Sequence, residues 1–354
     1  MGIVFGSGDI MKDLWQTLKT QEKPIYLYGM GNGADKILDE CIKRRVKICG
    51  VFASDGFVRN QQFRGFTVES YSDVKKREGD FTALLCFGSS LENVISSIKE
   101  KMGEITLLSP SVPVCGTNIF DGEFYEKNLE KIEFARSLLA DGMSKKVYDG
   151  IISYRLSGEL KYLFEIETDR FENYSLLSLQ DEVFADLGAY RGETIREIDK
   201  ICNIIKAYAF EPDSRSFGKL SESFSKNDRT ECFNFAVGEK DGEEAFSQNR
   251  GRGSSLGEGN GKIKTVCLDN LLSDKKITFI KADVEGNEIN ALRGAKGIIE
   301  KNRPKLKISV YHRAEDIFEI PIFINRLNGR YKIYLRHERS VPDWETDVFA
   351  VEGE

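Results

Sequence analysis

The sequence predicts an α/β protein built around two parallel sheets of unequal size. Short β-rich runs alternate with helical patterns in two separate parts of the chain, and such alternation is typical of parallel sheets covered by helices. The 354 residues are enough for two domains, each with its own core. We expect a small α/β domain over residues 1–120, a helical connector and cap over 121–175, and a larger doubly wound domain over 176–354.

Composition and charge exclude several classes of protein. The net charge of -6 gives no electrostatic basis for a nucleic-acid partner or a membrane surface. Seven scattered cysteines without a CxxC pair indicate buried thiols in a reducing cytoplasm rather than disulfides or zinc ligands. The first residues lack the pattern of a signal peptide, and no apolar run approaches the roughly 20 residues that cross a bilayer. We therefore expect a cytoplasmic protein without a membrane span.

The first α/β domain carries a glycine turn after its first strand. Gly29, Gly31 and Ala34 fit a relaxed dinucleotide fingerprint in GMGNGA, and Asp55 follows at about the distance of a ribose-binding acid. The same turn also occurs in small Rossmann-like domains that bind nothing tightly, and that structural interpretation is slightly favoured. The strands expected here are 25–28, 46–52 and 82–87.

The connector has a different pattern. Apolar residues at helical spacing predict helices over 123–139 and 147–163. We expect these helices to cover the mouth of the second domain.

The second domain begins with a strand, a tight turn and a helix start in VFADLGAYRGETI. The apolar run from Val183 ends in Asp186, Gly188 and Gly192 follow, and a helical pattern starts at Glu193. A carboxylate just before the glycines would repel a pyrophosphate but suits a cationic ligand. S-adenosylmethionine carries an ammonium and a sulfonium and has no phosphate, so it fits this acid.

The next strand, 206–211, ends in a second acid. Glu211 can accept two hydrogen bonds from a ribose diol, and Pro212 is expected at the first position of the following helix. A third strand is expected over 230–237. The polar insertion 238–261 after it, with Arg250, Arg252, Ser254 and Ser255, has no obvious structure and suggests either a lid or disorder.

A further group of ionisable residues belongs to the fourth and fifth strands. Alternation places Lys281, Asp283 and Glu285 on one side of the expected strand 277–285. In a doubly wound sheet the fourth strand lies beside the first, so Asp186 and Asp283 should face one crevice. The fifth strand, 305–311, delivers His312 to the same edge.

The phrases DLGAYRGET, AFEPD, FIKADVEGNEINALRGA and SVYHRAEDIFEIP resemble the FkbM-type family of S-adenosylmethionine-dependent methyltransferases over about residues 121–354. The resemblance implies a class I methyltransferase fold, with a doubly wound seven-stranded mixed sheet whose last strand is antiparallel, after a smaller N-terminal Rossmann-like domain. It implies methyl transfer to an oxygen, with a sugar, polyketide or other small molecule or glycan as acceptor. The cofactor residues that it implies are Asp186, Gly188, Ala189, Gly192, Glu193, Thr194, Glu211, Pro212, Ala236, Val237 and Asp283.

Asp283, Glu285 and His312 would then face the acceptor. A neutral His312 would serve as the general base, with Asp283 orienting it or the acceptor. Glu285 has an alternative role as a cap of the following helix. In a second version all three residues bind Mg²⁺ or Mn²⁺, although the spacing does not require a metal.

Two other functions stay open from sequence. One is a binding protein with a non-catalytic methyltransferase-like domain. The other is an oxidoreductase that uses NAD at Gly29–Ala34 of the first domain, or a protein that binds NAD(P) or a nucleotide sugar there. The intact acids Asp186 and Glu211 argue against a decayed site. The sequence also leaves open whether the chain forms a homodimer.

Overall fold

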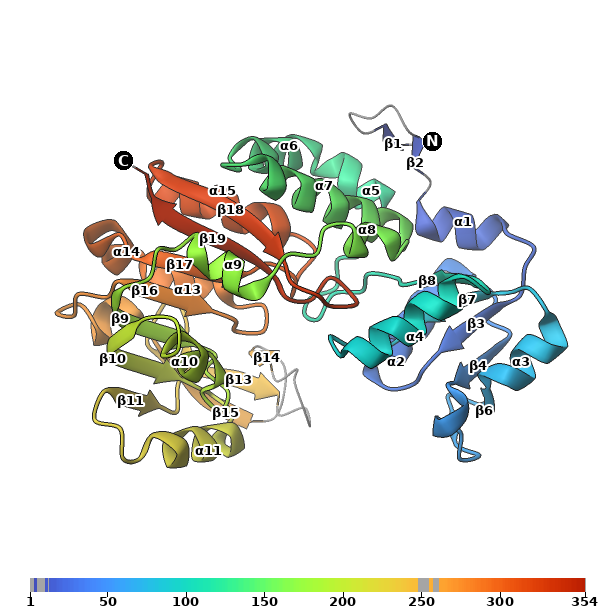
Figure 1. Cartoon of the computed structure of the whole chain (residues 1–354), viewed down its shortest axis with the longest axis horizontal. Helices are drawn as coiled ribbons and strands as arrows, with labels where there is room; N and C mark the ends of the chain where they lie inside the picture. The colour runs from blue at the N-terminus through green and yellow to red at the C-terminus, as the bar shows by residue number, and fades with distance from the viewer. Residues whose placement is uncertain (1–2, 5–9, 12, 248–254, 257–260, 354) are drawn as a thin grey trace.

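The computed structural model describes residues 3–4, 10–11, 13–247, 255–256 and 261–353. It contains two α/β parts joined by a group of helices (Figure 1). Arg250, Arg252 and Ser254 lie outside the described residues. Among the residues that are described, none of the helices has the length and apolar character to span a bilayer.

The N-terminal part is a six-stranded sheet in which every neighbouring pair is parallel except β5 and β6. In spatial order its strands are β5 (Gln62–Phe63), β6 (Phe66–Ser70), β4 (Gly50–Ala53), β3 (Ile25–Tyr28), β7 (Thr82–Leu85) and β8 (Thr106–Leu108). Its helices are α2 (Asn32–Arg44), α3 (Tyr71–Glu78) and α4 (Glu92–Met102), and α1 (Leu14–Thr20) precedes the sheet. The three strands expected from sequence are present, although β4 starts only at Gly50.

The connector forms five helices rather than two, and the longest of them has 16 residues. They are α5 (Gly122–Lys127), α6 (Leu129–Ser137), α7 (Gly142–Ser157), α8 (Lys161–Phe164) and α9 (Arg170–Ser175). Asp121 and Asp141 cap α5 and α7, which explains where those helices begin.

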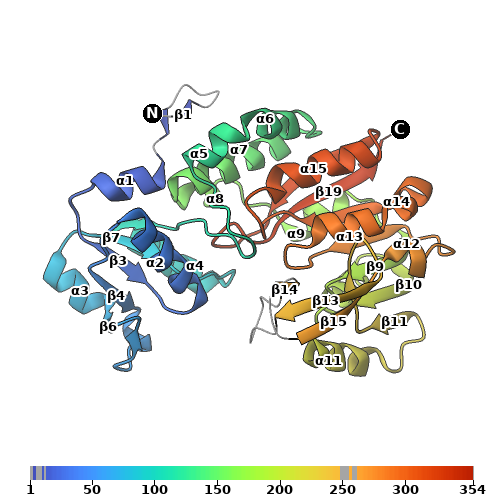
Figure 2. The same ribbon diagram turned by 180° about the vertical axis from the view of Figure 1, so that it is seen from behind.

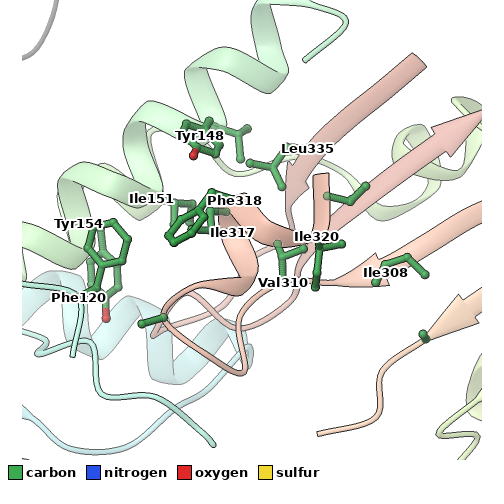
Figure 3. Close-up of a cluster of buried hydrophobic side chains, with 14 of the residues drawn as sticks. Phe120, Tyr148, Ile151, Tyr154, Ile308, Val310, Ile317, Phe318, Ile320 and Leu335 are labelled. Carbon is green, nitrogen blue, oxygen red and sulfur yellow. The ribbon is translucent and has the colours of Figure 1, made fainter. Parts of the chain in front are cut away.

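Helices α6 and α7 pack against α15 (Asp316–Leu327) and β18 (Tyr331–His337), at one edge of the larger sheet. Tyr148 and Ile151 of α7 lie in one buried cluster with Phe318 and Leu335 (Figure 3). The cover over the mouth of the larger sheet that we expected is therefore not formed by α6 and α7.

The larger sheet has seven strands in the order β11-β10-β9-β16-β17-β19-β18. The strands besides β18 are β11 (Thr230–Phe233), β10 (Asn203–Phe210), β9 (Asp181–Leu187), β16 (Phe279–Ala282), β17 (Lys305–Ser309) and β19 (Thr346–Glu352). Strand β19 is antiparallel to both of its neighbours and the other strands are parallel. This confirms the predicted mixed sheet, including the position of β16 beside β9.

Helices cover both faces of this sheet. Figure 1 shows α9 and α10 (Glu193–Ile198) on one face, and Figure 2 shows α13 (Glu288–Gly294), α14 (Lys296–Asn302) and α15 on the other. Helix α11 (Ser214–Phe224) packs against β11.

The expected third strand and the insertion after it are arranged differently from the prediction. Residues 230–237 divide into β11 and β12 (Ala236–Val237), and β12 belongs to a separate four-stranded sheet. The other strands of that sheet are β15 (Gly261–Val266), β13 (Gly242–Ser247) and β14 (Ser255–Leu256). The described part of the insertion is therefore largely β structure, because β13 pairs with β15 in an antiparallel ladder.

Candidate active site

The turn after β9 requires glycine at both predicted positions. Gly188 has φ +78°, and a Cβ atom there would lie 1.9 Å from the carbonyl oxygen of Asp283. Gly192 has φ +83°, and a Cβ atom there would lie 2.3 Å from the Phe224 ring. Glycine therefore lets the turns that follow β9 and β16 come into direct contact at the carboxyl edge of the sheet.

Asp186 lies against a lysine that sequence reasoning did not assign to it. Its side chain is fully buried, and its Oδ1 lies 3.2 Å from the Nζ of Lys281 on the neighbouring strand. Lys281 also donates to the carbonyl oxygen of Gly188 at 2.8 Å. Burial alone would lower the pKa of Lys281, but Asp186 and Asp283 raise it above its usual value. As placed here, Asp186 is paired with Lys281 beside the glycine turn, and its direct contact with the cofactor stays a prediction.

Glu211 lies at the end of β10, where a ribose-binding acid was expected. It is 7% exposed, and its two carboxylate oxygens accept hydrogen bonds from the backbone N–H groups of Tyr190 and Asp213, each at 2.8 Å. Burial raises the pKa of Glu211 to about 7, against the lowering effect of these two hydrogen bonds. The carboxylate is therefore held rigidly at the sheet edge beside the glycine turn.

The remaining predicted cofactor residues surround these two features. Ala189 is buried and its N–H donates to the carbonyl oxygen of Phe210 at 2.9 Å. Glu193 begins α10 and accepts from the N–H of Arg191, and Thr194 follows it, half-buried.

Two of the expected positions need correction. Pro212 is not the first helical residue, because Asp213 is the N-cap and α11 begins at Ser214. Ala236 and Val237 are buried within β12 instead of ending a strand of the large sheet.

The predicted acceptor residues do converge. His312 is 1% exposed, and its Nε2 lies 3.3 Å from Oδ1 of Asp283 and 3.6 Å from Oε2 of Glu285. On the opposite side of the ring, Nδ1 lies 2.9 Å from Oε1 of Glu288. The hydroxyl of Tyr311 donates to Oδ1 of Asp283 at 3.3 Å. One imidazole is thus surrounded by three carboxylates at the carboxyl ends of β16 and β17.

This arrangement does not favour a neutral His312. Burial by itself would lower the pKa of the imidazole, but Glu288, Asp283 and Glu285 together raise it to about 10. Without a cation bound nearby, these carboxylates therefore favour the protonated ring, whereas a general base or a metal ligand needs the neutral one. The general-base role of His312 stays a prediction. Burial raises the pKa of Glu285, whereas Lys281 and His312 hold the pKa of Asp283 below its usual value in spite of burial.

Glu285 does not cap the following helix. Helix α13 starts at Glu288 with Asn287 as its N-cap residue, and Glu285 has φ +53° in the turn before it. Its carboxylate is directed to His312 instead. A residue other than glycine is strained at such a positive φ, and backbone strain of this kind is concentrated at functional sites.

Sequence reasoning missed Glu288. Its Oε1 accepts from the N–H groups of Val284 and Gly286 at 2.9 and 3.4 Å, so it ties the turn after β16 to the His312 ring. The signal was a second glutamate in VEGNE, five residues after Asp283, at the start of a helix. Asp316, also missed, is buried and accepts from the N–H of Arg313 at 2.9 Å.

The segment that leaves the N-terminal sheet runs beside this cluster. The N–H of Cys115 donates to the carbonyl oxygen of His312, and its Sγ donates to that of Glu285, both at 2.9 Å. Lys36 of α2 donates to the carbonyl oxygens of Pro113 and Val114. The N-terminal part is thus connected to the site through its own backbone.

The contacts of the glycine turn after β3 are those of a turn that serves packing. A Cβ atom at Gly33 would lie 2.4 Å from the carbonyl oxygen of Cys86, so this glycine allows α2 to pack closely on β7. Asp55 accepts from both the N–H and the hydroxyl of Ser72, at the first turn of α3. The carboxylate that was expected to bind a ribose therefore accepts hydrogen bonds from the start of α3 instead.

Comparison with known proteins finds methyltransferases that are similar to the part of the chain that contains this site. Residues 186–332 match the methyltransferase FkbM domain family. The 2-O-methyltransferase NoeI of Sinorhizobium fredii is 26% identical over 154 residues, which cover 36% of this chain and 63% of that protein. The crystal structure of methyltransferase FkbM from Methylobacillus flagellatus has a TM-score of 0.71 at 20% identity and covers 95% of this chain and 92% of its own.

The structural likeness extends to the N-terminal sheet, which lay outside the resemblance seen in sequence. The family match begins at Asp186 and so includes the glycine turn. Residues 186–332 of this chain match the model of the methyltransferase FkbM domain family, and the chain has the fold of methyltransferase FkbM from Methylobacillus flagellatus.

Proposed function

We propose that this chain is an S-adenosylmethionine-dependent O-methyltransferase that methylates a hydroxyl group of a sugar or of a sugar-containing small molecule in the cytoplasm. The observation that carries the proposal is the pairing of two groups at one sheet edge. The glycine turn with Glu211 is suited to a nucleoside, and the cluster of Asp283, Glu285 and His312 lies next to it across β9 and β16.

The donor would bind along the turn after β9. Glu211 would accept hydrogen bonds from the ribose hydroxyls, and the Gly188 carbonyl, held by Lys281, would face the amino-acid end. S-adenosylmethionine supplies the methyl group. The chain itself contributes mainly position, because an in-line displacement at sulfur depends on the alignment of donor and acceptor.

The acceptor hydroxyl would lie against Asp283 and Glu285, which are the more open members of the cluster, with side chains 36% and 29% exposed. The hydroxyl proton would pass to one of these two carboxylates as the new bond forms. The similarity to NoeI, a 2-O-methyltransferase, supports an oxygen acceptor.

Calorimetry with S-adenosylmethionine tests the donor half. We expect binding to the wild-type chain and a strong loss of affinity in Glu211→Ala, whereas Glu319→Gln on α15, which pairs with Lys131, should bind normally. A thermal-shift panel should show stabilisation by S-adenosylmethionine and S-adenosylhomocysteine. Stabilisation by NAD, NADP or a nucleotide sugar alone would indicate a ligand site at the glycine turn of the N-terminal part and would overturn the proposal.

Mass spectrometry tests the acceptor half. Candidate sugars and sugar nucleotides incubated with the chain and S-adenosylmethionine should gain one methyl group. Products methylated on nitrogen or carbon would contradict the assignment of an oxygen acceptor.

A further inference from the structure

The carboxylates around His312 outnumber the positive groups available to them. Asp283, Glu285 and Glu288 all approach this one ring, and Asp316 is buried nearby, where burial and then Glu288 raise its pKa to about 8. Lys281 also forms an ion pair with Asp186, and the Nε–H of Arg313 donates a hydrogen bond to the carbonyl oxygen of Gly286. Buried carboxylates in such excess are either protonated or paired with a cation.

Three of the ligand-type side chains are already close to one another. Atoms of Asp283, Glu288 and His312 that could bind a metal all lie within 4.8 Å of one another. Glu288, however, approaches the ring at Nδ1, whereas Asp283 and Glu285 approach it at Nε2. An imidazole binds a given ion through one of its two nitrogens. An ion bound at Nε2 is therefore close to Asp283 but not to Glu288, which lies at Nδ1.

The two sides of the ring also differ in burial. Glu288 is fully buried, and its second carboxylate oxygen has no hydrogen-bond partner among the described residues. Asp283 and Glu285 reach solvent on the Nε2 side. A carboxylate behind one histidine nitrogen, with the other nitrogen directed to an accessible set of oxygens, is the usual arrangement of a metal-bound histidine.

We propose that His312 Nε2, Asp283 and Glu285 bind one divalent cation and that Glu288 orients the His312 ring for it. The inference deepens the proposed methyl transfer and rests on the same site. Ligands of a small octahedral cation, at about 2.1 Å from it, lie about 3 Å apart. The separations of 3.3 and 3.6 Å from Nε2 to the two carboxylates need little adjustment to reach that geometry.

A ligand set of two carboxylates and one imidazole suits Mn²⁺ better than Ca²⁺, because Ca²⁺ sites consist of oxygen ligands alone. Bound there, a cation would lower the pKa of an acceptor hydroxyl. Asp283, Glu285 and His312 would hold the ion, and the positions left to water would be open to the acceptor. Glu288 is a positioning residue in this scheme, since it acts through His312.

Titration with Mn²⁺ alone tests the inference without any methyl transfer. The electron paramagnetic resonance signal of free Mn²⁺ should be lost as one ion binds per wild-type chain. Asp283→Asn and Glu285→Gln keep side-chain shape and should lose most of this binding. Glu288→Gln should weaken it by about 10- to 100-fold, as expected for a group that orients a ligand.

Glu319→Gln serves as the matched acid-to-amide control and should bind Mn²⁺ as the wild type does. Thermal unfolding of each variant shows whether the fold is kept, and S-adenosylmethionine affinity by calorimetry reports the donor half separately. Absence of Mn²⁺ binding to the wild type, or unchanged binding in Asp283→Asn and Glu285→Gln, overturns the cation site. If Mn²⁺ binds but S-adenosylmethionine does not, the methyl-transfer proposal fails and the cation site stands.

Discussion

Lys281 and Asp186 carry opposite charges on neighbouring strands, and both side chains are almost entirely buried. Removing one member of such a pair leaves an uncompensated charge in the interior and costs about 3–5 kcal/mol. We therefore expect Lys281→Met to be strongly destabilised. The double variant Asp186→Asn with Lys281→Met should recover part of that loss, because the remaining amide carries no charge.

Urea unfolding of the two single variants and the double variant measures this coupling. Strictly additive losses would mean that the two side chains do not interact in the folded protein. Binding of S-adenosylmethionine to the double variant shows whether Lys281 also holds the Gly188 carbonyl for the ligand.

Glu211 should make donor binding depend on pH. Because burial raises the pKa of this carboxyl to about 7, it is largely protonated at pH 6 and largely ionised at pH 8. The ionised form accepts the ribose hydroxyl hydrogen bonds more strongly. Affinity for S-adenosylmethionine should therefore rise from pH 6 to pH 8, as measured by calorimetry, and Glu211→Gln should bind weakly with a flat profile. A steep profile in that variant would assign the effect to another group.

The turn after β9 can be tested as an element. In Gly188→Ala, the added methyl group would meet the Asp283 carbonyl, and a positive φ costs an alanine about 1–3 kcal/mol in addition. We expect lower stability and loss of S-adenosylmethionine binding. Gly218→Ala is the control, since Gly218 is exposed in α11 with no atom within 4 Å of its Cβ position, and should be neutral or slightly stabilising.

The end of β18 contains the second histidine. His337 is fully buried, and burial lowers its pKa to about 4, while its Nδ1 lies 2.9 Å from the Thr346 hydroxyl. A depressed pKa means that the unfolded chain binds the proton more readily. Stability from this residue is complete above about pH 6.5 and is lost as pH falls toward 4, by up to about 3 kcal/mol.

Urea unfolding at pH 7.5 and pH 5 measures that loss. His337→Gln should be less stable at pH 7.5 but should lose less than the wild type on acidification. An equal loss in both proteins would show that other groups control the acid sensitivity.

The elements show which parts of the site are visible in sequence. Gly188, Gly192 and Glu211 follow directly after strands, and strand ends can be read from apolar runs. His312 and Asp283 were found in the same way. Glu288 could not be found in this way, because its contact with His312 depends on where the start of α13 lies relative to the turn after β17.

Asp186 shows a different limit of the sequence. Its place at a strand end was correct, but the charge it meets comes from Lys281 on a strand nearly 100 residues later, and strand register decides that pairing. The division of residues 230–237 between two sheets likewise depends on pairing of β12 with β15, which no local pattern encodes.

At the scale of the whole molecule, the two α/β parts are in direct contact. Ser89, after β7, exchanges two backbone hydrogen bonds with Val341 in the loop between β18 and β19. A Cβ atom on Gly88 would lie 2.3 Å from the Trp344 ring. We expect the wild type to unfold in one calorimetric transition, and Gly88→Val to separate it into two, because the valine forces this contact apart.

Gly56→Val is the matched control for that experiment, since the Cβ position of Gly56 has no neighbour within 4 Å. It should keep the single transition. Two transitions already in the wild type would show that the contact through Ser89 and Gly88 is too weak to couple the parts.

The position of β19 has a consequence for synthesis on the ribosome. The N-terminal sheet is complete once Leu108 has emerged, so it can form while the rest of the chain is still being made. The larger sheet cannot, because β19 inserts between β17 and β18, which are both translated before it. Until then β18 has no strand partner in that sheet and exposes unpaired backbone groups. Nascent chains halted before Thr346 should therefore be the species that aggregate or recruit chaperones.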